Sequence, residues 1–69
     1  MEEIKIYTDF IKLDDLLKYA GILSSGGQAK AVIKDGLVKV NDEVCLMRGK
    51  KLFGNEIIEF NCTKIKVIK

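Results

Sequence analysis

Six basic side chains in the middle of the sequence are the residues whose type and spacing most clearly allow a binding chemistry. They are Lys30, Lys34, Lys39, Arg48, Lys50 and Lys51. Ammonium and guanidinium groups neutralise phosphates, and a single-stranded nucleic acid held this way loses affinity with salt at a slope of roughly −0.7 per phosphate. If the six share one face, they predict a polyanion-binding surface. The alternative is a solvated surface that serves solubility.

The distribution of charge supports the first interpretation. The formal net charge is only +2. Residues 1–15, however, carry five acids against two lysines, whereas residues 16–69 carry ten basic residues against five acids. Such asymmetry is a hint of a polyanion-binding face.

No catalytic or metal-ligating pattern accompanies the cations. The sequence lacks histidine, and Cys45 and Cys62 are far apart, whereas zinc needs about four closely spaced ligands. The adjacent acids at 14 and 15 suit the first turn of a helix and point in different directions around it. The Gly26-Gly27 pair could offer helix amides to a phosphate, but the nucleotide-binding fingerprints are absent. We therefore expect no enzyme activity, no cofactor and no metal.

Two helices must position the cations. Segment 13–20 has leucines and alanine at i, i+3, i+4 and i+7, and Gly21 suits a helix end. The second helix begins in a capping-box pattern, in which Ser25 accepts from a first-turn amide and Gln28 reaches back, with Ser24 as the alternative cap. This helix should end at Gly36 and bury a stripe at 29, 32 and 33. Lys30 and Lys34 then share its opposite side.

Alternating apolar residues predict strands at 3–8, 37–40, 43–46, 57–60 and 64–68. Asn41 and Asp42 predict the turn between the second and third of these. The fold class is therefore α+β, with two short helices packed on a small antiparallel sheet. Sixty-nine residues suit a single domain, 1–69. With no apolar run of about 20 residues and no signal-peptide core, we expect a cytoplasmic protein without a membrane span.

The spacing of these residues resembles the RNA-binding domain named after ribosomal small-subunit protein four, the S-four domain. The shared pattern, over about residues 12–60, is Leu13-Asp14-x-x-Leu17, Gly21, Ser25, Gln28-Ala29-Lys30, Ile33, Gly36 and Val38-Lys39-Val40-Asn41. Segments 24–30 and 48–52 are similar to the small stand-alone YaaA-like subgroup.

The resemblance implies a two-helix-plus-strand unit, the αL motif, that binds structured RNA. The implied contacts are Ser25, Gln28, Lys30, Lys34, Lys39, Asn41, Arg48, Lys50 and Lys51. Gln28 and Asn41 also have structural roles, in the cap and in the turn. The chain departs from the family at Gly26, where arginine is frequent, and in the turns Asn41-Asp42 and Gly54-Asn55.

The sequence therefore predicts a monomeric, non-enzymatic RNA-binding module. Its expected partner is structured RNA, in particular ribosomal RNA or a ribosomal subunit during assembly or quality control. The alternative function is a protein–protein interaction adaptor with a ubiquitin-like or similar small α+β fold, although the carboxyl terminus lacks the diglycine of such carriers.

Overall fold

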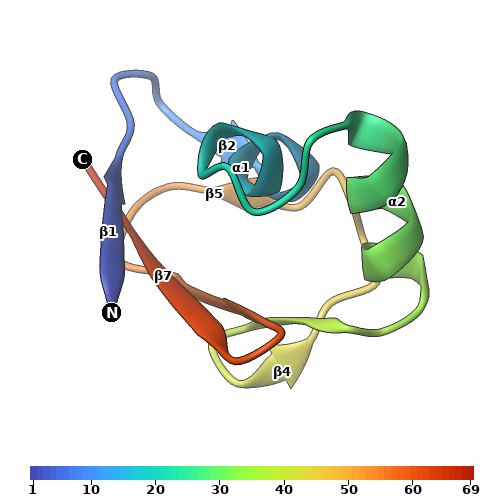
Figure 1. Cartoon of the computed structure of the whole chain (residues 1–69). Coiled ribbons are helices and arrows are strands. Elements are labelled where there is room, and N and C mark those ends of the chain that lie inside the picture. Colours follow the sequence, from blue (N-terminus) through green and yellow to red (C-terminus); the bar gives the residue numbers. More distant parts are fainter.

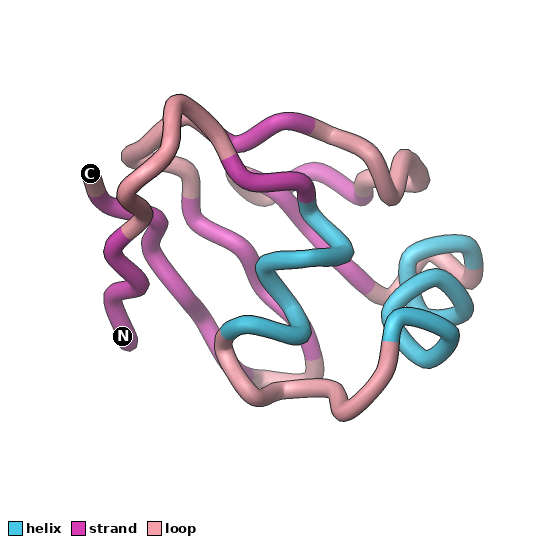
Figure 2. The backbone as a smooth tube through the Cα atoms, turned by 90° about the horizontal axis from the view of Figure 1, so that it is seen from above, coloured by secondary structure: helices cyan, strands magenta, loops and turns pink.

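Two helices form one layer of the protein and a five-stranded sheet forms the other (Figure 1). The computed structural model describes residues 1–69. The helices are α1 (Leu13–Tyr19) and α2 (Gly26–Lys34). Seen from above, α1 lies over the strands, whereas α2 lies at one side of the molecule (Figure 2). The predicted fold class, α+β with two helices on a small sheet, is confirmed.

The five strands are mixed in direction. Their order is β1 (Glu2–Lys5), β7 (Thr63–Ile68), β6 (Ile57–Phe60), β3 (Val38–Val40) and β4 (Glu43–Val44). Neighbours from β7 to β4 are antiparallel, as predicted. The purely antiparallel sheet is corrected at one edge, because β1 pairs parallel with β7. The whole chain between these strands serves as the long connection that a parallel pair requires.

A separate two-stranded ladder pairs β2 (Ile11–Lys12) with β5 (Lys51–Leu52). Two residues in each strand are too few for an alternation that would predict this ladder. Segment 43–46 is also shorter than expected, since the strand ends at Val44 and a loop follows to residue 50.

Both helices end in the same backbone motif. Gly36 has a positive φ of 77°, and its amide donates to the Ile33 carbonyl while the Leu37 amide donates to the Val32 carbonyl. This pair of bonds is the Schellman motif. Gly21, at φ 76°, ends α1 in the same way. Both predicted helix stops are confirmed.

The core lies between the helices and the inner face of the sheet and contains no buried polar side chain. The helices contribute Leu13, Leu16, Leu17, Ala29 and Ile33; the strands and loops contribute Ile6, Val38, Val40, Leu52, Ile58, Ile65 and Val67. Because a strand alternates between its two faces, residues between these core positions lie on the outer face of the sheet. No helix is of a length and apolarity that would let it cross a membrane.

Candidate nucleic-acid interface

Helix α2 presents Lys30 and Lys34 to solvent. Ala29 and Ile33 are fully buried, which fixes the rotation of the helix and leaves both lysines exposed beside the buried stripe. The amide of Gln28 donates to Ser25 Oγ at 3.3 Å, so Ser25 caps the helix as predicted.

Gln28 makes a different contact from the one expected. Its Oε1 accepts from the amide of Ser24 at 3.1 Å and from Ser24 Oγ at 3.0 Å, instead of from the Ser25 amide. Both serines therefore take part in the cap. Because the side chains of Ser25 and Gln28 are already engaged in these bonds, they position α2. The amides of Gly26 and Gly27, in the first turn, have no partner within the chain.

The loop between β4 and β5, residues 45–50, contains Arg48 and Lys50, and we call it the basic loop. It is attached to the beginning of α1. The Leu13 amide donates to the Lys50 carbonyl at 2.9 Å, and the Asp14 amide donates to the Arg48 carbonyl at 3.1 Å. No side chain caps α1, whose N-cap residue is Lys12. The loop carbonyls satisfy the helix amides in place of a side chain, so the loop has a defined position beside both helices.

This attachment brings Arg48 to α2. Lys30, Lys34 and Arg48 line one hollow of about 180 Å³ together with Ile33 and Leu46. We call it the cationic hollow. No carboxylate lines it, so three positive charges surround a space open to an anion. Phosphate oxygens are the natural partners of such a cluster.

A second and larger hollow, of about 550 Å³, lies between the β3–β4 hairpin and residues 50–56. Its lining includes Asn41, Lys50 and Lys51 among the predicted site residues, but six of its eleven lining residues are hydrophobic. We call it the apolar hollow. Leu46 lines both hollows, so they are neighbours separated by the basic loop.

Asn41 supports the turn at the rim of the apolar hollow. Its amide donates to the Ile57 carbonyl at 2.8 Å, and its Oδ1 accepts from the Ile57 amide at 3.0 Å. With φ of 51° at Asn41 and 70° at Asp42, the two residues form a tight hairpin turn. The predicted turn role of Asn41 is confirmed, and the oxygen of its side-chain amide accepts a hydrogen bond within the protein.

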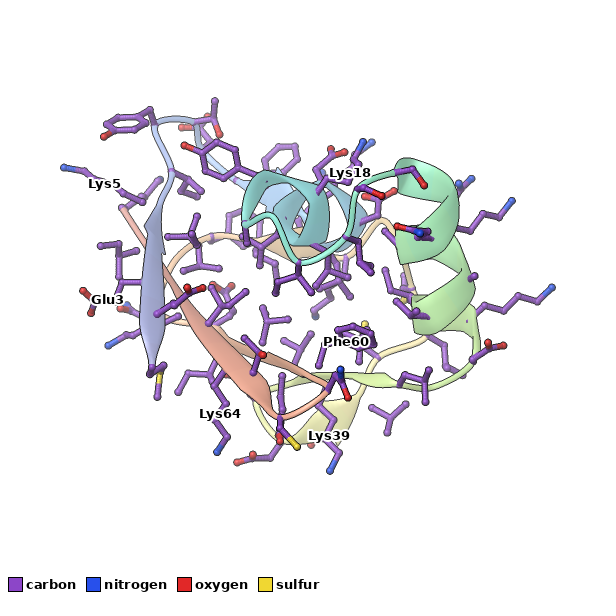
Figure 3. All side chains as sticks on the ribbon, in the orientation of Figure 1. Glu3, Lys5, Lys18, Lys39, Phe60 and Lys64 are labelled. Carbon is purple, nitrogen blue, oxygen red and sulfur yellow. The ribbon has the colours of Figure 1, made fainter.

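Lys39 does not join the other cations. Val38 and Val40 are buried on the inner face of the sheet, so Lys39 lies on the outer face, opposite Glu59 of β6. Figure 3 shows it pointing away from the helices, on the same side as Lys64. The structure therefore divides the six cations into two at the apolar hollow, three at the cationic hollow and Lys39 apart.

Two lysines outside the predicted set lie near these sites. The Nζ of Lys18 is 3.6 Å from the point where a β-carbon would stand at Gly26, and Figure 3 shows Lys18 beside the beginning of α2. Its partner is Asp15, at 3.3 Å. Lys12 lies directly opposite Lys51 in the β2–β5 ladder. Only the packing of α1 on α2 and the short ladder reveal these positions.

The cations of both hollows have no acidic partner within the protein. The structure contains a single salt bridge, Asp15–Lys18. Lys30, Lys34, Arg48, Lys50 and Lys51 are all exposed and unpaired. Their charges are thus available to an external anion.

The fold and these cations define the class of the protein. The chain belongs to the S4 domain family, a family of RNA-binding domains, and the family model matches residues 4–68. The resemblance found in the sequence is confirmed over nearly the whole chain.

Particular relatives agree with this assignment. The chain is 41% identical over 56 residues to the "Probable ribosome maturation protein RlbA" of Bacillus subtilis (strain 168), which covers 81% of this chain and 79% of the relative. Its structure is similar to the solution structure of YbcJ from E. coli, with a TM-score of 0.77 and 30% identity, covering 100% of this chain and 89% of the other. That structure is described as revealing an αL motif involved in RNA binding.

Proposed function

We propose that this protein binds structured RNA without catalysing a reaction, and that its RNA is ribosomal RNA in a maturing ribosomal subunit. One observation carries the proposal: Lys30, Lys34 and Arg48 surround a hollow that no carboxylate lines. Membership of an RNA-binding family supports the RNA. The relative named as a ribosome maturation protein supports the ribosomal context.

In this proposal the cationic hollow receives a backbone phosphate. Three charges from α2 and the loop fix the phosphate from different directions, and the free amides at the beginning of α2 contact a neighbouring phosphate. Lys18, released from Asp15, is the lysine nearest to Gly26, where the family frequently has arginine. Lys50 and Lys51 extend the contact along the loop. Ser25, Gln28 and Asn41 hold the backbone in shape, and Lys39 lies at the periphery.

The remaining parts of the proposal concern the state of the protein. We propose that it acts as a single-domain monomer in the cytoplasm. RNA is recognised mainly by its shape, because phosphate contacts carry no sequence information.

A filter-binding titration with a structured ribosomal RNA fragment tests the proposal at several salt concentrations. We expect saturable binding that weakens steeply with salt. The Lys30→Gln/Lys34→Gln variant should weaken it. The control Lys64→Gln/Lys69→Gln removes the same charge outside both hollows and should leave it nearly unchanged. Binding that is absent at low salt, or that ignores salt, contradicts the proposal. The adaptor alternative gains if cellular protein partners survive charge reversal at 30 and 34.

A further inference from the structure

The apolar hollow exposes large hydrophobic side chains that the fold leaves uncovered. Four of them are more than half exposed: Val44 at 53%, Leu46 at 63%, Met47 at 67% and Phe53 at 55%. They line one continuous space. Apolar surface is more stable buried than exposed to water, and a contiguous exposed patch of it is typical of a binding surface.

One wall of this hollow is an aromatic ring held in a fixed position. The rings of Phe53 and Phe10 pack with centroids 6.0 Å apart and planes tilted by 57°. Lys51 Nζ lies 4.8 Å from the centre of the Phe10 ring. The amides of Phe53 and Gly54 donate to the two oxygens of Glu56, at 2.8 and 2.7 Å. Phe53 is thus braced through both its ring and its backbone while remaining exposed.

The cationic hollow next to the apolar hollow favours a polyanionic occupant. Lys50 and Lys51 have no acidic partner. The lining also holds two carboxylates, Glu43 and Glu56, the second of which accepts from two amides, so the formal charges of the lining offset one another. The basic loop and Leu46 also border the cationic hollow. An RNA strand with a phosphate there therefore continues directly past the apolar hollow.

We propose that the apolar hollow takes one unpaired nucleobase of the bound RNA. The base lies against the exposed ring of Phe53 and beside Met47 and Leu46, while Lys50 and Lys51 hold the flanking phosphates. Stacking on aromatic rings combined with a basic track is how proteins bind unpaired nucleotides. This inference rests on the proposed RNA-binding function and adds a preference for RNA that contains an unpaired base.

Two RNA hairpins of equal length, one fully paired and one with a single bulged nucleotide, provide the first test. We expect the bulged hairpin to bind roughly tenfold more tightly, the effect of one stacked base. Phe53→Ala should remove this preference without changing the affinity for the paired hairpin, and Phe53→Tyr should keep it. Tyr19→Ala, which removes an exposed ring outside the hollow, is the matched control.

The outcomes separate this inference from the function on which it rests. If neither hairpin binds, the proposed function fails. If both bind equally, or if Phe53→Ala keeps the preference, the inference is overturned while RNA binding stands. If Phe53→Ala keeps the preference, the unpaired base binds elsewhere, and a protein segment becomes the better candidate for the apolar hollow.

The two cysteines allow a test in the unaltered protein. Cys45 lines the hollow, whereas Cys62 is exposed at the β6–β7 turn outside it. Bulged RNA should slow the alkylation of Cys45 by a maleimide several-fold and leave Cys62 unchanged, as followed by mass spectrometry. Paired RNA should protect Cys45 less. Equal protection by the two RNAs, or none, overturns the inference.

Discussion

Lysines lie in two regions of the molecule: on the side formed by α2 and the basic loop, and on the outer face of the sheet. The surroundings of the lysines differ between these two regions. On the sheet, Lys39 and Lys64 both lie opposite Glu59, and Lys66 lies opposite Glu3. Opposite charges on neighbouring strands stabilise a sheet. No acid is among the residues that line the cationic hollow. Three lysines of the sheet thus have two glutamates on neighbouring strands, none within salt-bridge distance, whereas the lining of the hollow contains no carboxylate at all.

Replacing Ile33, which holds the lysine-bearing helix on the core, should have the largest effect. Ile33 is fully buried beneath Lys30 and Lys34. Ile33→Ala should lower the free energy of unfolding by about 2–5 kcal/mol, through lost burial and the cavity left behind. Urea denaturation followed by circular dichroism measures the change. Val44→Ala removes a similar side chain that is more than half exposed, and a loss of equal size there would contradict the assigned core.

Removing the charges of the cationic hollow should have the next largest effect. The Lys30→Gln/Lys34→Gln/Arg48→Gln variant should lose affinity for structured RNA on the order of 100-fold at low salt, and its salt slope should fall by about 2. The matched Lys39→Gln/Lys64→Gln/Lys66→Gln variant removes the same formal charge from the sheet. If both variants lose the same affinity in filter binding, net charge rather than position governs binding.

Removing the side-chain cap of α2 should have a smaller effect on the position of its lysines. Ser25→Ala leaves the Gln28 amide without its acceptor and should cost about 1 kcal/mol of stability. RNA affinity should fall a few-fold, because Lys30 lies in the frayed first turns. Ser24→Ala, whose amide still donates to Gln28, should cost less in the same denaturation and binding measurements. The reverse order would show that Ser24 is the principal cap.

The smallest effect is expected at Glu59. Glu59→Gln removes the carboxylate opposite Lys39 and Lys64 and should lower stability by only about 0.2–1 kcal/mol. It also removes the negative charge that lies nearest to these two lysines on β6, so the affinity for fully paired RNA should rise by up to about twofold at low salt. An unchanged affinity in a low-salt titration would mean that Glu59 does not mask these lysines.

The helices and their lysines could be predicted because the information is local. The 3.6-residue period, the serine cap and the two glycine stops are all contained within segment 13–36. Val38 and Val40 point to the inner face of the sheet, so the intervening Lys39 must point to the outer face. Because α2 packs on the inner side, Lys39 is separated from the lysines of α2. The family resemblance predicted an RNA-binding protein, but it did not predict that Lys39 lies apart from the other cations.

Other features depend on contacts between distant segments. The parallel pairing of β1 with β7 joins the two ends of the chain, and alternation within one strand does not specify the direction of its neighbour. The β2–β5 ladder is two residues long, too short for a pattern. Arg48 reaches α2 only because its carbonyl accepts from the Asp14 amide, a backbone contact that leaves no trace in side-chain types.

That backbone contact also bears on how the protein can diversify. The acceptors offered to α1 are the carbonyls of Arg48 and Lys50, and every amino acid carries a carbonyl. The side chains at these two positions can therefore be exchanged while the anchor bonds are kept. Substitutions at these two positions can therefore change which RNA is bound while the loop stays attached to α1.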